Sequence, residues 1–173
     1  SDARFALFRS ESLSRTLVAE LADARVAAPH EIVALQDEAR SGRTPTRNGF
    51  RRDLPTGLLV DLTPTPEASA KRAAAPGLLS SAESGSITWV GSFRATGAWA
   101  LRVLLTNVAV PPGTRFVVCG GAQADCTAFG VEAVTDRDEI WSPIVDGEVL
   151  HLEVSIPAGG PDSPHGGFVP AAL

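Results

Sequence analysis

Large apolar residues alternate with polar or small residues in the second half of the chain. The pattern is clearest in Ala98–Thr106 and Val149–Ile156, where every second position is apolar. A period of two is typical of a strand with one buried face, so His151 and Glu153 are expected to point outward. The expected inward positions are Trp99, Leu101, Val103 and Leu105 in the first segment and Leu150, Leu152, Val154 and Ile156 in the second.

Further short apolar segments are separated by turn-forming residues. Pro111-Pro112-Gly113 suits a turn, because proline fixes φ and glycine accepts a positive φ. The sequence therefore predicts a mainly β domain, an antiparallel β-sandwich of the jelly-roll kind, with Phe116 and Val118 in its core. The other expected strands are Gly57–Leu62, Ser86–Val90, Thr114–Cys119, Cys126–Val131 and Ile140–Val145.

The N-terminal region predicts helices instead. Two helices are expected there. The second is expected to begin at Pro29, to have Glu31 near its N-terminal dipole and to end at Gly42. The expected buried faces are Leu13, Leu17, Leu21 and Ala24 in the first helix and Ile32, Leu35 and Ala39 in the second. The fold class is therefore a β-sandwich with an N-terminal helical extension.

The chain is expected to have three parts. Residues 1–56 form the helical extension and a basic segment, and residues 57–156 form the β-sandwich domain. Within that domain, residues 63–85 are rich in Pro, Ala and Ser and are interpreted as a connector. Residues 157–173 are rich in Pro and Gly and are interpreted as an exit linker.

Charge is distributed unevenly along the chain. The net charge of −5 arises from about +1 in residues 1–72 and −6 in residues 73–173. Residues 73–173, which contain most of the expected strands, lack clustered Lys and Arg, so we do not expect the protein to bind nucleic acid. One basic run is either a solvated turn that lies against the acidic β half or a docking patch for an acidic partner. Its members are Arg40, Arg43, Arg47, Arg51 and Arg52.

Two cysteines, Cys119 and Cys126, flank a loop that contains Gly120-Gly121. They can form a disulfide if the strands on either side pair as a hairpin, which implies an oxidising compartment. The alternative is two unlinked thiols in a cytosolic protein. No apolar run approaches the length of a membrane span, so no membrane span is expected.

Candidate metal and catalytic residues are few. His30, His151 and His165 have no spacing that brings two of them together, and no serine lies in a G-x-S-x-G elbow. An acidic cluster of Asp136, Asp138 and Glu139 could hold calcium through hard oxygen ligands, or could be a solvated turn before a strand. No other cofactor is expected.

Three tryptophans, Trp89, Trp99 and Trp141, could form an aromatic platform for a sugar. Trp99 has the same phase as the apolar residues that follow it, which predicts a core position. Trp141 precedes Ser142-Pro143 and is the one of the three that is expected to be partly exposed.

Several segments together resemble a known protein region. They are Gly97–Val103, Pro111–Val118, Ile140–Glu148 and Leu152–Val154, preceded by the arginine- and glycine-containing stretch Ala39–Phe50. This combination resembles the non-catalytic N-terminal region of secreted bacterial trypsin-like serine endopeptidases, the lysyl-endopeptidase-like group. The resemblance spans residues 31–156.

The resemblance implies a non-enzymatic role. A trypsin-like catalytic domain would show a histidine in a T-A-x-H-C context and a serine in G-D-S-G-G, and neither motif occurs in this sequence. The expected function is that of a pro-region or accessory domain that assists folding of the protease, inhibits it or positions it. Its partner would be a cognate protease domain in cis or nearby, and its location extracellular, or periplasmic in transit. The alternative is an extracellular jelly-roll module that binds carbohydrate or a cell surface.

Overall fold

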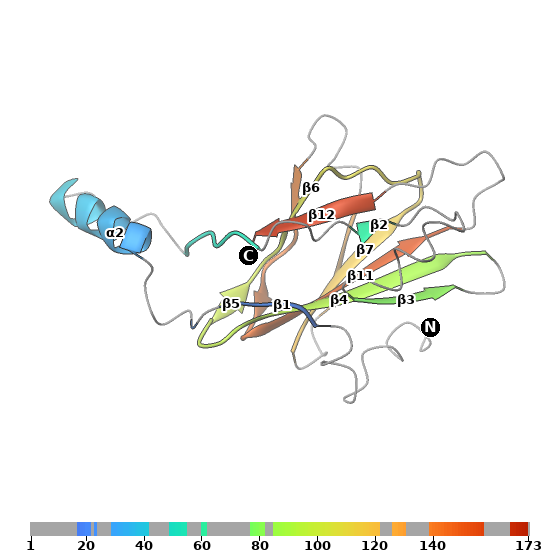
Figure 1. Cartoon of the computed structure of the whole chain (residues 1–173), viewed down its shortest axis with the longest axis horizontal. Coiled ribbons are helices and arrows are strands. Elements are labelled where there is room, and N and C mark those ends of the chain that lie inside the picture. The colour runs from blue at the N-terminus through green and yellow to red at the C-terminus, as the bar shows by residue number, and fades with distance from the viewer. Residues whose placement is uncertain are drawn as a thin grey trace.

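The computed structural model confirms that the protein is mainly β (Figure 1). It describes residues 17–21, 23, 29–41, 49–54, 60–61, 77–81, 85–121, 126–130, 139–157 and 167–172.

Among the described residues the largest sheet has six strands, with β11 (Val149–Ile156) near its centre. β11 pairs antiparallel with β4 (Ile87–Ala95) on one side and with β7 (Arg115–Gly120) on the other. β7 continues the sheet to β8 (Cys126–Gly130). The bounds of β11 are those that the alternation of apolar residues predicts.

Two separate segments share the remaining edge of β4. β3 (Leu78–Ser81) pairs antiparallel with Ile87–Val90, whereas β1 (Leu17–Leu21) pairs parallel with Ser92–Ala95. The sheet is therefore mixed: its described strand pairs are antiparallel, as expected, except for the parallel pair of β1 with β4.

Smaller sheets complete the β structure. One has the order β2 (Val60–Asp61), β12 (Gly167–Ala172), β6 (Leu104–Thr106) and β9 (Glu139–Trp141). The other pairs β10 (Val145–Asp146) with β5 (Ala100–Leu101).

One hydrophobic cluster joins the sheets. It contains Trp89, Phe93 and Phe116 from the large sheet together with Val60 and Leu105 from the four-stranded sheet. All the expected core residues of β11 belong to it: Leu150, Leu152, Val154 and Ile156. Burying these side chains supplies the main favourable term in folding.

The predicted first helix is wrong where the structure describes it, because Leu17–Leu21 form a strand. Leu17 and Leu21, placed on a helical stripe by their spacing, lie in strand β1. Pairing with β4 supplies backbone hydrogen bonds and buries Ala19, and this outweighs a weak helical pattern. Leu13 and Ala24 lie outside the described residues.

The second predicted helix is present as α2 (Pro29–Ser41), but Ile32 does not belong to a buried face as expected, and the burial of Leu35 and Ala39 is not described. Ile32 and Val33 are exposed, and Glu31 is the residue of the first turn that is buried. The helix stands at one end of the molecule, away from the large sheet (Figure 1).

Strands also occur in both segments that were interpreted as linkers. β3 lies within the connector at 63–85, and β12 lies within the exit linker at 157–173. β12 pairs with both β2 and β6, and its register shifts at Pro170, which has no backbone N–H to donate. Clusters of Pro and Gly concealed these short strands in the sequence.

The expectation that His151 and Glu153 point outward into solvent is wrong. His151 is 6% exposed and Glu153 is 3% exposed, so both faces of β11 are buried. Alternation locates the strand, but it does not reveal that the polar face is covered as well.

Candidate functional site

An open groove of about 940 Å³ lies where the segment after α2 approaches the connection between β4 and β5. Phe50, Arg51 and Arg52 line one side of it, and Trp99, Arg102 and Ile144 line the other. These residues come from three stretches of the sequence that are far apart. The groove is the candidate site because exposed aromatic and cationic side chains meet there.

Trp99 is the most unusual residue of the groove, because its side chain is 93% exposed. The expectation that it lies in the core is wrong. The predicted strand 98–106 is divided into β5 and β6, and Thr96-Gly97 forms a turn just before Trp99. Trp99 lies in the bend between this turn and β5, outside the strand, so it does not share the phase of Leu101, Val103 and Leu105, which are buried as predicted.

Hydrogen bonds hold the backbone of the turn at Trp99. The carbonyl of Trp99 accepts a bond of 2.7 Å from the Gly147 N–H. The Gly97 N–H donates to the Glu148 carboxylate at 2.7 Å, and the Ala98 N–H donates to the Ala95 carbonyl at 3.1 Å. Trp99 is therefore an exposed indole on a well-anchored turn.

Arg102 and Trp141 form a second feature of the groove. The guanidinium carbon of Arg102 lies 4.4 Å from the centroid of the Trp141 ring, which is a cation–π arrangement. Ser142 fixes this region, since its backbone N–H donates to the Val103 carbonyl and its hydroxyl accepts from the Val103 N–H. Trp141 is partly exposed, as its position before Ser142-Pro143 predicts.

The sugar platform proposed for the three tryptophans is not assembled as a set. Trp89 is buried in the core, whereas Trp99 and Trp141 both line the groove. Two of the three tryptophans therefore remain available to a ligand or a partner.

Arg52 has a structural partner within the chain. Its Nε donates to Glu31 Oε1 at 2.9 Å and its Nη2 donates to Glu31 Oε2 at 3.0 Å. The Glu31 side chain is 1% exposed and that of Arg52 is 17% exposed. Hydrogen bonding to Glu31 raises the pKa of Arg52. This bidentate pair joins the first turn of α2 to the segment that lines the groove.

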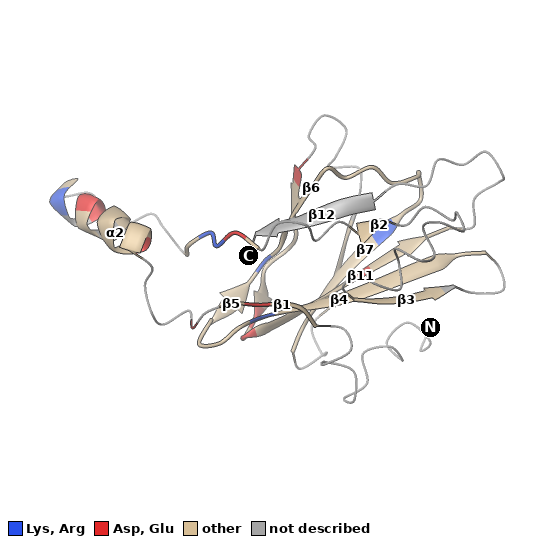
Figure 2. Ribbon diagram, viewed as in Figure 1, with Lys and Arg blue, Asp and Glu red and all other residues tan. Residues whose placement is uncertain are grey.

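The other described members of the basic run, Arg40 and Arg51, also lie near carboxylates. Arg40 is 3.6 Å from Asp37, and Arg51 is 3.0 Å from Asp53, with all four side chains exposed. Figure 2 shows acidic and basic residues side by side on α2 and on the segment 49–54. Arg43 and Arg47 lie outside the described residues. A partner-binding role for these arginines stays a prediction, and Arg52 has a structural role besides.

Ser92 and His151 form a buried polar pair in the large sheet. Ser92 Oγ and His151 Nδ1 lie 2.7 Å apart, and burial lowers the pKa of His151. A serine beside a histidine is also the start of a hydrolytic site. Ser92 has no exposed surface, however, so its hydroxyl is closed to a substrate in this fold.

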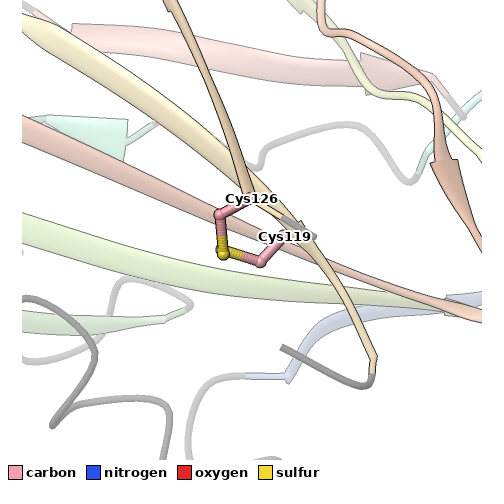
Figure 3. The surroundings of a disulfide bond; sticks show 2 residues. All are labelled: Cys119 and Cys126. Atoms are coloured by element: carbon pink, nitrogen blue, oxygen red, sulfur yellow. A yellow bond between two sulfur atoms is a disulfide. The ribbon is translucent and has the colours of Figure 1, made fainter. Parts of the chain in front are cut away.

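The two cysteines form a disulfide between β7 and β8 (Figure 3). Cys119 and Cys126 are directly opposite each other in the register of the two strands. The bond therefore closes the hairpin at its loop end, as the cysteine spacing predicts.

Metal binding has no support from the described residues, none of which form a group of three or more suitable ligands. Glu139 begins β9 and is exposed, while Asp136 and Asp138 lie outside the described residues. The calcium site therefore stays a prediction. His30 lines the groove, and His165 lies outside the described residues. No described helix has the length and apolar character needed to cross a membrane.

The described residues define a mainly β domain with a disulfide and a groove lined by exposed aromatic and cationic side chains. Comparison with protein families assigns it more closely, since the family described as Lysyl endopeptidase N-terminal domain matches residues 66–165. The chain belongs to this family, as the motifs around Gly97–Val103 and Ile140–Glu148 predict. It is thus a protease-associated N-terminal domain. No curated protein and no solved structure shows a match to the chain.

Proposed function

We propose that this chain is the pro-region or accessory domain of a secreted trypsin-like serine endopeptidase. The observation that carries the proposal is the family match over residues 66–165, which covers β3 to β11 and the Trp99 side of the groove. The domain binds its cognate catalytic domain, in cis or as a separate chain, and assists its folding, inhibits it or positions it.

The chain itself is proposed to have no hydrolytic activity. The sequence lacks both trypsin-like motifs, and Ser92, which contacts His151, is buried. A nucleophile needs both an activating base and access to substrate. Catalysis then belongs to the partner, and this domain contributes binding.

The disulfide is consistent with a secreted protein. Disulfides persist in oxidising compartments and are rare in the cytosol. Closing the β7–β8 hairpin also stabilises a domain that has to fold outside the cell.

The proposal is tested by refolding the catalytic domain encoded in the same genome with and without this chain. We expect this chain to increase the yield of active protease, to reduce its activity at stoichiometric concentration, or to bind it without either effect. The absence of binding, or of any such protease gene, would contradict the proposal. Binding to a glycan array would then favour the jelly-roll carbohydrate module, which the exposure of Trp99 also allows.

A further inference from the structure

We propose that the groove between Trp99, Arg102 and Ile144 on one side and Phe50 and Arg51 on the other is the surface that docks the catalytic domain. This inference rests on the proposed function. The groove binds an acidic surface loop of the protease that carries an apolar side chain next to a carboxylate.

Apolar exposure is the first argument. Trp99 is 93% exposed and Ile144 is 63% exposed, and both line the same groove as Phe50. Single exposed apolar residues are ordinary, but several gathered at one groove mark an interaction site. Tryptophan is also the side chain most enriched among residues that dominate binding energy at protein interfaces.

Rigidity is the second argument. The Trp99 carbonyl is bonded to Gly147 and the Gly97 N–H is bonded to Glu148, so the turn is anchored to the segment that leads into β11. An anchored turn loses little backbone freedom when a partner covers its side chain, and this preorganisation favours binding. An indole that served only as a solvated turn residue would need no such anchoring.

The charged residues that line the groove favour an acidic partner. The described residues that line the groove include three arginines, Arg51, Arg52 and Arg102, and one acidic residue, Glu31. Arg52 is paired with Glu31 and Arg51 with Asp53, so Arg102 is the lining arginine that can complement an acidic partner of this acidic chain. Among the described residues, no carboxylate lies within ion-pair distance of Arg102. Its guanidinium stacks on Trp141 and keeps donors for a carboxylate of the partner.

The Glu31–Arg52 pair gives the groove its second wall. Because Glu31 belongs to α2 and Arg52 to the segment 49–54, their bidentate contact sets the position of Phe50 and Arg51 relative to the helix. Arg52 is therefore a positioning residue, and Arg102 is the arginine that contacts the partner.

The test is titration calorimetry between the full chain and the trypsin-like catalytic domain encoded in the same genome, with its nucleophilic serine replaced by alanine. We expect Trp99→Ala to weaken binding about 30-fold, the effect of losing a strong interface residue, and Trp99→Phe to weaken it less. Arg102→Gln should weaken binding about 5-fold or more and should reduce its dependence on salt.

Arg115→Gln is the matched control, because Arg115 is an exposed arginine of β7 that does not line the groove. It should bind as the unmodified chain does. Thermal unfolding of each variant verifies that these exposed positions leave the fold intact.

The outcomes separate the two proposals. If the unmodified chain binds and the Trp99 and Arg102 variants bind equally well, the docking site is wrong and the proposed function stands. If the unmodified chain does not bind at all, the proposed function fails and this site fails with it. Glycan binding that is lost in Trp99→Ala would overturn the protein-docking role of the groove.

Discussion

Ser92 and His151 are directly opposite each other in the register of β4 and β11, and they share a hydrogen bond of 2.7 Å inside the large sheet. Both side chains are buried. A buried imidazole is easier to keep neutral than charged, so burial lowers the pKa of His151 below the ordinary value of 6.5.

This pair predicts that the domain loses stability in mild acid. Because the pKa of His151 is lower in the folded state, the unfolded chain binds more protons between the folded pKa and 6.5. The contribution of His151 to the free energy of unfolding is complete above pH 6.5 and falls as the pH drops toward the folded pKa. Urea unfolding at pH values from 7.5 to 5, in steps of about half a pH unit, measures how the free energy of unfolding changes with pH.

His151→Asn should remove this part of the slope. The exposed His30→Asn is the matched control and should keep it. A slope that is unchanged in His151→Asn would show that other groups cause the acid sensitivity.

A second prediction concerns the contact between α2 and the groove segment. Glu31→Gln should destabilise the attachment of the helix by about 3 kcal/mol, because breaking a buried ion pair leaves the other charge uncompensated. Amide hydrogen exchange in Pro29–Ser41 is the measurement, and exchange should become faster there while β11 is unaffected. Asp37→Asn is the control, since the Arg40–Asp37 pair is exposed and should contribute less than about 1 kcal/mol. Equal exchange in both variants would contradict the structural role of Glu31.

A third prediction follows from the packing of Trp89 over the backbone of β4. A Cβ atom at Gly91 would lie 2.6 Å from Trp89 Cζ2 and 2.7 Å from Val18 Cγ2. Gly91→Ala should therefore lower the free energy of unfolding by about 1–3 kcal/mol, the cost of overpacking a core. Chemical denaturation measures it. Gly49→Ala is the control, because no atom lies within 4 Å of the added Cβ, and comparable losses in both variants would argue against a clash.

A fourth prediction concerns the disulfide. Mass spectrometry of the unreduced protein should find no free thiol at Cys119 or Cys126. Replacing both by serine should cost about 2.5 kcal/mol, because the unfolded chain then regains the entropy of a short open loop. An unfolding midpoint that is the same with and without reductant would contradict this.

The strand β11 could be located from the sequence because apolar residues occupy every second position from Leu150 to Ile156. The alternation wrongly predicts that Trp99 is buried. The apolar pattern extends to Trp99, but this residue lies in a bend before β5 and its side chain is exposed. Thr96-Gly97 was the available signal for the turn that precedes this bend. Helix and strand are also hard to separate in five residues such as Leu17–Leu21, where pairing with β4 decides the outcome.

The groove could not be predicted from the sequence. Its walls come from segments around Phe50, Trp99 and Trp141, and only the fold brings them together. The basic run could be identified in the sequence. The ion pair between Glu31 and Arg52 could not be predicted, because 21 positions separate the two residues. Arg102 lines the groove without a described acidic partner, and its place between Leu101 and Val103 does not mark it as a groove residue in the sequence.

The shared edge of β4 has a consequence for the order of folding. β3 lies close to β4 in sequence and can pair early, whereas β1 must return from about seventy positions away to cover Ser92–Ala95. Until β1 arrives, half of a nine-residue strand presents unpaired backbone groups to other chains. We therefore expect newly made protein to be prone to aggregation at this half-edge, and we expect the long-range parallel contact to form late in folding.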